Sequence, residues 1–322
     1  MNKCTIEKIK NIEQFEKKLC KYHFSCLCPN CSQKAINSHS IQRNGWLSSI
    51  AENGHVVGVK RRLAGHLYNT LENSSFNQII DKIGLAEAST FKGYCNDHDT
   101  SLFRSIEQES LNINSVRQVF AFHLRAMSFE RIAKIKLIAI LIVSKMLPDE
   151  VFIQKELFYA DSKYRWNLFW QSNKYDYFSK NYSYKWCKVE KNLGVASVTM
   201  IPPLSAIIED QYMTEHLRFD GTYNIARPAF SLSVIPTENE THIVMCWHNE
   251  ENHLVAPWIN EFCQEDSYLL SKFLNKCIFT KSEDFYIRPS LWYSLSEVTR
   301  QKVCENLNPK NTNCQIPEVI EI

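Results

Sequence analysis

The sequence predicts an α+β protein with a small Cys/His finger near its N-terminus, long helices in the centre and an antiparallel sheet with helices in its C-terminal half. The finger is indicated by two Cys/His pairs at close spacing, and the long helix by apolar residues over about 116–146. Short alternating segments beyond Pro148 indicate the sheet. A chain of 322 residues is long enough for two or three domains. We predict a finger domain with an N-terminal helix and an insertion at 1–112, a helical connector at 113–150 and an α+β domain at 151–322.

The N-terminal part begins with a helix over 3–21, because its apolar residues recur at helical spacing. A knuckle-like turn at 26–31 follows, and then a strand within 35–42. Asn53-Gly54 is the strongest two-residue turn signal in the chain, so we expect a hairpin with arms at 46–52 and 55–61. The pattern predicts that residues 63–92 are mainly helical and then loop-like, and that a further turn enters a helix over 93–107.

The C-terminal part alternates apolar and polar residues in three segments, which predicts strands at 182–186, 230–235 and 242–247. Two amphipathic segments predict helices over 266–277 and 296–307. Ser294 and Glu297 have the spacing of a capping box before the second helix.

Composition excludes several common classes of enzyme. Only 8 residues are glycine, and neither a dinucleotide-binding glycine motif nor a P-loop is present, so we expect no nucleotide cofactor. The motifs of serine hydrolases, zinc proteases and kinases are also missing. The longest apolar run, Leu137–Val143, is far shorter than the roughly 20 residues of a membrane span. The start of the chain has no signal-peptide pattern, so we expect a cytoplasmic protein without a membrane partner.

Charge is concentrated near the N-terminus. Residues 1–66 contain 11 Lys/Arg and 4 Asp/Glu, although the net charge of the whole chain is only +2. A basic segment of this kind favours a polyanionic partner such as nucleic acid. For residues 3–21 we prefer the simpler interpretation that the lysines solvate one face of a helix.

Two close pairs of ligand residues carry the clearest chemistry. Cys28 and Cys31 form one pair, and Cys95 and His98 form the other. Zinc prefers four nitrogen or sulfur ligands in a tetrahedron, so the sequence predicts a structural Zn²⁺ site of three cysteines and one histidine. Cys26 is the alternative ligand in the first pair. The competing interpretation is a set of buried thiols beside a surface histidine.

The order of knuckle, hairpin and helix with a ligand pair at its start is that of a treble-clef zinc finger. Because 63 residues separate Cys31 from Cys95, we expect an insertion between the hairpin and the helix. A closed site of this composition stabilises its fold by roughly 10 kcal/mol or more.

Residues 26–107 resemble the zinc-bound finger of HNH-type nucleases. The resemblance rests on His39, eight residues after the knuckle, and on Asp99, directly after the last zinc ligand. Segments 35–42 and 93–99 are also similar to bacterial proteins encoded among phage-defence genes. The resemblance implies a metal-dependent nuclease that cleaves phosphodiester bonds, with a role in antiviral defence.

The resemblance also implies roles for single residues. His39 would be the general base, and Asp99 would hold a catalytic Mg²⁺ or Mn²⁺. Asn53 or Asn44 would orient His39. The basic residues that would bind phosphates of DNA or RNA are Arg43, Lys60, Arg61 and Arg62.

The sequence departs from the HNH pattern in two places. The residue before the histidine is Ser38, where the family usually has an acidic metal ligand. No third metal ligand is evident on the helix, unless Asp97 or Glu107 reaches the site. The alternative function is therefore a non-enzymatic zinc-finger adaptor that binds nucleic acid or a protein subunit of a defence complex.

Overall fold

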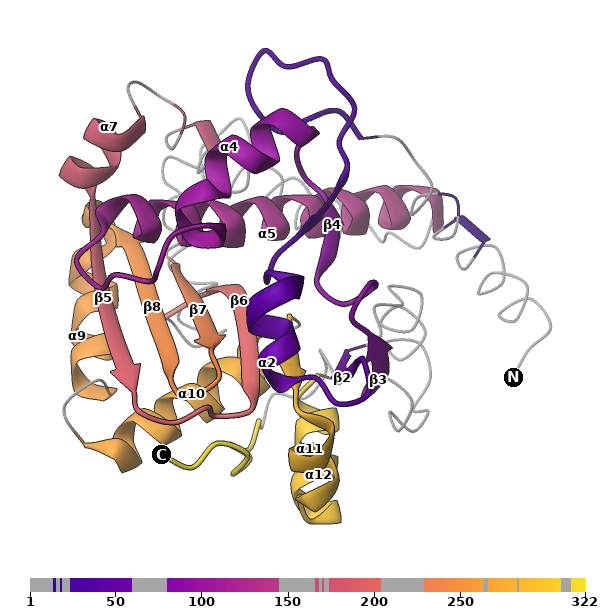
Figure 1. The fold of residues 1–322 in the computed structure, drawn as a ribbon, viewed down its shortest axis with the longest axis vertical. Coiled ribbons are helices and arrows are strands. Elements are labelled where there is room, and N and C mark those ends of the chain that lie inside the picture. Colours follow the sequence, from indigo (N-terminus) through magenta and orange to yellow (C-terminus); the bar gives the residue numbers. More distant parts are fainter. Residues whose placement is uncertain are drawn as a thin grey trace.

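The computed structural model describes residues 24–59, 80–144, 174–203, 229–262, 266–282, 284–307 and 314–322, together with residues 14, 15, 18, 166, 167 and 170. Within these residues the chain combines helices with antiparallel sheets. A small two-stranded sheet lies near the N-terminus, and a large sheet of seven strands forms the centre of the fold. Figure 1 shows the long helix α5 (Val116–Ser144) running across the strands of the large sheet.

The strands, in chain order, are β1 (Asn37–His39), β2 (His55–Val59), β3 (Ile80–Gly84), β4 (Thr90–Lys92), β5 (Tyr182–Val189), β6 (Val195–Ile201), β7 (Phe230–Pro236), β8 (Thr241–His248) and β9 (Phe285–Ile287). The longer helices are α4 (Asn96–Glu107), α5 (Val116–Ser144), α7 (Lys174–Asn181), α9 (Asn252–Phe262), α10 (Ser267–Lys281) and α12 (Glu297–Asn306). The short helical turns are η1 (Arg43–Leu47), α2 (Ser48–Ile50), η2 (Asn249–Glu251) and α11 (Pro289–Ser294).

The large sheet has the strand order β3-β2-β9-β6-β7-β8-β5, and its neighbours are antiparallel. Strand β2, from the N-terminal part of the chain, pairs with β9, from the C-terminal part. The sheet therefore crosses the predicted boundaries between 1–112, 113–150 and 151–322. Strands from the N-terminal and C-terminal parts of the chain thus belong to the same seven-stranded sheet.

The central strands of the large sheet are covered on both faces. Alternate residues of each strand point to opposite sides, so each face packs against different helices. On one side the apolar residues of β6 and β8 pack with those of α5, as Val198 and Val244 do. On the other side Leu232 and Ile243 pack with α9 and α10. This three-layer arrangement explains why β6 and β7 are buried along their whole length.

Most of the elements predicted from residue 116 onward are confirmed. Helix α5 begins at Val116, and strands β5, β7 and β8 cover the three predicted segments. Helix α10 begins after Asp266, whose carboxylate accepts hydrogen bonds from the first turn. Helix α12 is capped by Ser296 instead of Ser294, since the Ser296 hydroxyl accepts from the backbone N–H of Thr299.

The Asn-Gly turn is confirmed, but the predicted hairpin around it is wrong. Asn53 and Gly54 have φ values of 51° and 74°, and Glu52 pairs with His55 across the turn. The first arm is helical instead of extended, because it forms η1 and α2. Strand β2 pairs with β3, which lies in the stretch expected to be helical and then loop-like. The helix predicted at 3–21 falls almost entirely outside the described residues.

The hairpin nearest the knuckle is the antiparallel pair β1–β4, with His39 opposite Thr90. Residues 40–89 therefore form an insertion between the two strands of this hairpin, and the prediction that the insertion follows the hairpin is wrong. Part of the insertion continues into the large sheet as β2 and β3. The long separation between Cys31 and Cys95 has its structural cause here.

Gly58 lies where the N-terminal strand β2 meets β9, and it leaves no room for a side chain. A Cβ atom there would lie 2.8 Å from the backbone oxygen of Phe285 and 2.8 Å from the ring of Tyr286. We expect Gly58→Ala to lower the free energy of unfolding by about 1–3 kcal/mol, the usual cost of overpacking. The measurement is the midpoint of urea unfolding. Gly84→Ala, where nothing lies within 4 Å, is the matched control and should stay near wild type. Equal effects at both positions would contradict this packing.

Among the described residues, no helix has the length and apolar character that crossing a membrane requires.

Candidate metal centre and adjoining polar site

The knuckle is a tight turn built by its own sequence. Residues 28–31 form the turn, with the backbone N–H of Cys31 donating to the carbonyl of Cys28 at 3.2 Å. Pro29 supplies the restricted φ of the second position, and Asn30 adopts a φ of 64°, which asparagine tolerates better than most residues. The backbone N–H of Leu27 donates to the carbonyl of Gly93 at 2.9 Å, so the knuckle is attached to the segment just before α4.

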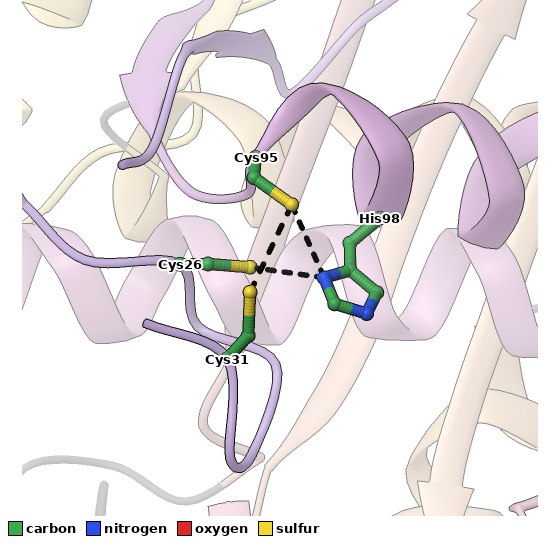
Figure 2. Close-up of side chains that lie close together, drawn as sticks. All are labelled: Cys26, Cys31, Cys95 and His98. Atoms are coloured by element: carbon green, nitrogen blue, oxygen red, sulfur yellow. Dashed lines mark hydrogen bonds between the residues drawn. The ribbon is translucent and has the colours of Figure 1, made fainter. Parts of the chain in front are cut away.

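Four side chains converge between the knuckle and the start of α4. They are Cys26, Cys31, Cys95 and His98, and their ligand atoms all lie within 4.8 Å of one another (Figure 2). The Nδ1 atom of His98 lies 3.4 Å from Sγ of Cys26 and 3.2 Å from Sγ of Cys95. The Sγ atoms of Cys31 and Cys95 are 3.9 Å apart.

These separations fit one tetrahedral zinc ion. With Zn–S of about 2.3 Å and Zn–N of about 2.1 Å, tetrahedral angles separate two sulfurs by roughly 3.8 Å and a sulfur from the nitrogen by roughly 3.6 Å. The measured distances are close to both values. The four residues could therefore hold a metal such as zinc.

The predicted ligand set requires one correction, because Cys26 takes the place expected for Cys28. The backbone N–H of Cys28 donates to Sγ of Cys26 at 3.4 Å. Cys28 thus supports the sulfur of a ligand from its backbone, while its carbonyl closes the turn. Its thiol is buried in the core cluster that also contains Tyr94.

Burial raises the pKa of the Cys26 thiol to about 12, with smaller effects from the hydrogen bonds around it. This thiol is therefore protonated at neutral pH unless a cation replaces the proton. A thiolate is the form that binds metal, so metal binding must release protons from this cluster.

His39, at the end of β1, is held through one of its two ring nitrogens. Its Nδ1 atom lies 3.2 Å from the carbonyl oxygen of Ala88 and 3.2 Å from Oγ of Ser89. A carbonyl can only accept, so Nδ1 carries the hydrogen and Nε2 keeps a lone pair. No hydrogen bond from the described residues occupies Nε2. Burial lowers the pKa of His39, against the effect of the Ala88 carbonyl, so the neutral form prevails at pH 7.

Ser89 fixes this arrangement and is itself fixed by the large sheet. It has a φ of 58°, an uncommon conformation for serine. Its hydroxyl donates to the carbonyl of Ile41 at 2.9 Å, so toward His39 the Oγ atom accepts. Its backbone N–H donates to the hydroxyl of Tyr286, on β9, at 2.6 Å. Backbone strain of this kind persists where the surrounding structure holds it, and it is frequent at functional sites.

Asp99 lies in the first turn of α4, directly after the cluster residue His98. The hydroxyl of Ser38, the neighbour of His39, lowers the pKa of this carboxyl group. Its Oδ1 atom is buried and has no hydrogen-bond partner within the described residues. Burial raises the pKa of Asp99, and the positive charge of Arg125 opposes this effect.

Arg125 and Glu107 connect the surroundings of His39 and Asp99. Both charges influence the pKa of each of these two residues. The Arg125 side chain, from α5, is 1% exposed and forms an ion pair with Glu107, which is 27% exposed. The guanidinium also lies 4.3 Å from the ring centroid of Phe103. Asp99, Phe103 and Glu107 recur every four residues, so they share one face of α4.

The other predicted site residues lie elsewhere. Asn53 is exposed in its turn, and its backbone carbonyl accepts a hydrogen bond from His55. The orienting contacts to His39 predicted for Asn53 come instead from Ala88 and Ser89. Asn44 is exposed and contacts the exposed Arg43. Asp97 is also exposed. Lys60, Arg61 and Arg62 fall outside the described residues.

Sequence patterns did not reveal Ser89, Tyr286 or Arg125. The first two are distant from His39 in sequence, and no motif joins them. Arg125 belongs to an apolar helix, where the only available signal was a lone cation within a buried stretch.

Comparison with known proteins yields no relative: no family model, no curated protein and no solved structure matches the chain. The functional argument therefore rests on the residues themselves.

Proposed function

We propose that the chain is a metal-dependent nuclease of HNH type, built on a zinc-bound treble-clef finger. The observation that carries the proposal is the hydrogen bonding of His39. Its Nδ1–H donates to a carbonyl, and no described residue forms a hydrogen bond to its Nε2, so the lone pair there can accept a proton. This is the form that a general base needs. Asp99 supports the proposal, because its buried Oδ1 atom has no hydrogen-bond partner in the part of the chain that the structure describes.

In the proposed reaction, Nε2 of His39 takes a proton from water while the water oxygen attacks the phosphorus of a phosphodiester. The bond from phosphorus to the leaving oxygen breaks, and a proton from solvent completes the leaving hydroxyl. The Ala88 carbonyl stabilises the imidazolium, because it accepts the Nδ1–H throughout. Mg²⁺ or Mn²⁺ held at Asp99 would supply charge stabilisation at the phosphate and the leaving oxygen.

The zinc centre has a positioning role in this proposal. The helix that carries Cys95 and His98 also carries Asp99, and the knuckle leads directly to β1 and His39. One ion at the cluster would fix both segments together. A function in phage defence, with DNA or RNA as the target, belongs to the same proposal.

The test compares Asp99→Asn with Asp97→Asn, two equal changes in one turn of α4. The zinc-loaded chain is incubated with plasmid DNA or an RNA pool, with Mg²⁺ or Mn²⁺. We expect Asp99→Asn to reduce cleavage at least 100-fold, because the neutral amide binds a cation poorly, and Asp97→Asn to cleave as wild type does. Absence of wild-type cleavage with both ions and both substrates would favour the adaptor function, in which the finger only binds.

A further inference from the structure

Arg125 is a buried cation whose hydrogen-bonding groups are only partly used. Nη2 pairs with Glu107, but Nε and Nη1 have no hydrogen-bond partner within the described residues. Native proteins leave few buried donors unpaired, and an unpaired charged donor is the most costly kind. A guanidinium presents its N–H groups as a planar fork that matches the oxygens of a phosphate.

We propose that Arg125 is a phosphate-binding residue of this site, and that Glu107 occupies its guanidinium until a phosphodiester of the nucleic-acid backbone displaces it. The inference rests on the proposed function and adds a residue outside the 26–107 segment that resembles HNH nucleases. Glu107 is suited to leave, because its side chain is partly exposed and can be solvated by water. Phe103 supports the guanidinium from one side, so Arg125 can stay in place while its partner changes.

The local charges determine when a phosphate can enter. The charges that act on Asp99 are those of Arg125 and Glu107, so around Asp99 two carboxylates face one guanidinium and oppose the entry of an anion. A divalent cation at Asp99 reverses the sign. Phosphate binding at Arg125 should therefore depend on Mg²⁺. Once the phosphate has displaced Glu107, this carboxylate should no longer compete for the guanidinium of Arg125.

The probe is a short, fluorescently labelled single-stranded phosphorothioate oligonucleotide, which resists cleavage. Its binding to the zinc-loaded chain is followed by fluorescence anisotropy, with and without Mg²⁺. A charge-assisted hydrogen bond contributes about 1.5–3 kcal/mol, which corresponds to roughly 10–100-fold in affinity. We expect Arg125→Lys and Arg125→Met to weaken Mg²⁺-dependent binding at least 10-fold. Glu107→Gln should bind as tightly as wild type or tighter.

Arg117→Met is the matched control, because Arg117 is an exposed arginine on the same helix, and its binding should change less than 2-fold. Arg125→Lys keeps the charge of the buried site and serves if Arg125→Met fails to fold. Circular dichroism and zinc content verify that each variant is intact.

Three results would overturn the inference. They are unchanged probe binding in folded Arg125 variants, an equal loss in Arg117→Met, and weaker binding of Glu107→Gln. Unchanged binding with unchanged cleavage would reject the role of Arg125 and leave the nuclease proposal standing. Loss of binding in the Arg125 variants, in a chain that cleaves nothing, would reject the nuclease and retain the phosphate site.

Discussion

Cys95→Ser is expected to abolish stoichiometric zinc binding and to unfold the finger. The hydroxyl of serine is a much weaker zinc ligand than a thiolate, and the three remaining residues cannot close the tetrahedron. Because structural zinc contributes roughly 10 kcal/mol or more to the folding of a small finger, the effect should exceed that of any single core substitution. Elemental analysis of the purified chain measures the zinc, and thermal unfolding measures the loss of stability.

The pair Cys26→Ser and Cys28→Ser supplies the control for this experiment. Both cysteines are buried and lie two residues apart, but only Sγ of Cys26 belongs to the cluster. We expect Cys26→Ser to lose zinc and Cys28→Ser to keep one ion per chain. Retention in Cys26→Ser with loss in Cys28→Ser would replace the ligand set by the one that the sequence predicts.

His39→Ala is expected to lower the rate of phosphodiester cleavage by about 10²–10⁴-fold, the usual contribution of a general base. The zinc content should not change, since His39 is not a member of the cluster. Cleavage of plasmid or RNA under initial-rate conditions measures the effect. An unchanged rate in a zinc-loaded His39→Ala chain would remove the base from the mechanism.

His55→Ala is the matched control, because His55 is exposed and its Nδ1 lies 2.7 Å from the carbonyl of Asn53.

The pH profile adds a second check. The form of His39 proposed to act as the base is the neutral one, and burial lowers the pKa of His39 below the ordinary value of 6.5. The rate should therefore be level at pH 7 and above and fall only below pH 6.5. A fall that begins near pH 8 would indicate a different base.

Local patterns predicted elements whose own residues alternate or recur at helical spacing, but not the pairing of strands that are distant in sequence. The hairpin β7–β8 has a short polar turn, and α5 is a long segment without Gly or Pro that is rich in apolar residues, so both are visible in a short window. The pairing of β2 with β9 could not be predicted, since more than 200 residues separate the two strands. Residues 46–52 were predicted as a strand from the Asn-Gly turn that follows them, but residues 46–50 are helical.

Three residues of the metal cluster were predicted from their spacing, and the fourth was not. The motif C-x-x-C favours Cys28, but the backbone direction at the turn decides which thiol faces α4. That direction depends on the attachment of Leu27 to Gly93, a contact between distant parts of the chain. The orientation of His39 likewise depends on Ser89 and not on the predicted Asn53, because the pairing of β1 with β4 brings residue 89 beside it.

The hydrogen bond from Ser89 to Tyr286 has a consequence for engineering. A finger grafted onto another scaffold would keep its cysteines but would lack the Tyr286 hydroxyl, which holds Ser89 in contact with His39. Such a chimera should bind zinc normally, but the side chain of His39 should no longer be held in one orientation. The four cluster residues can thus be transplanted alone, whereas the geometry proposed for catalysis also requires Tyr286 of β9.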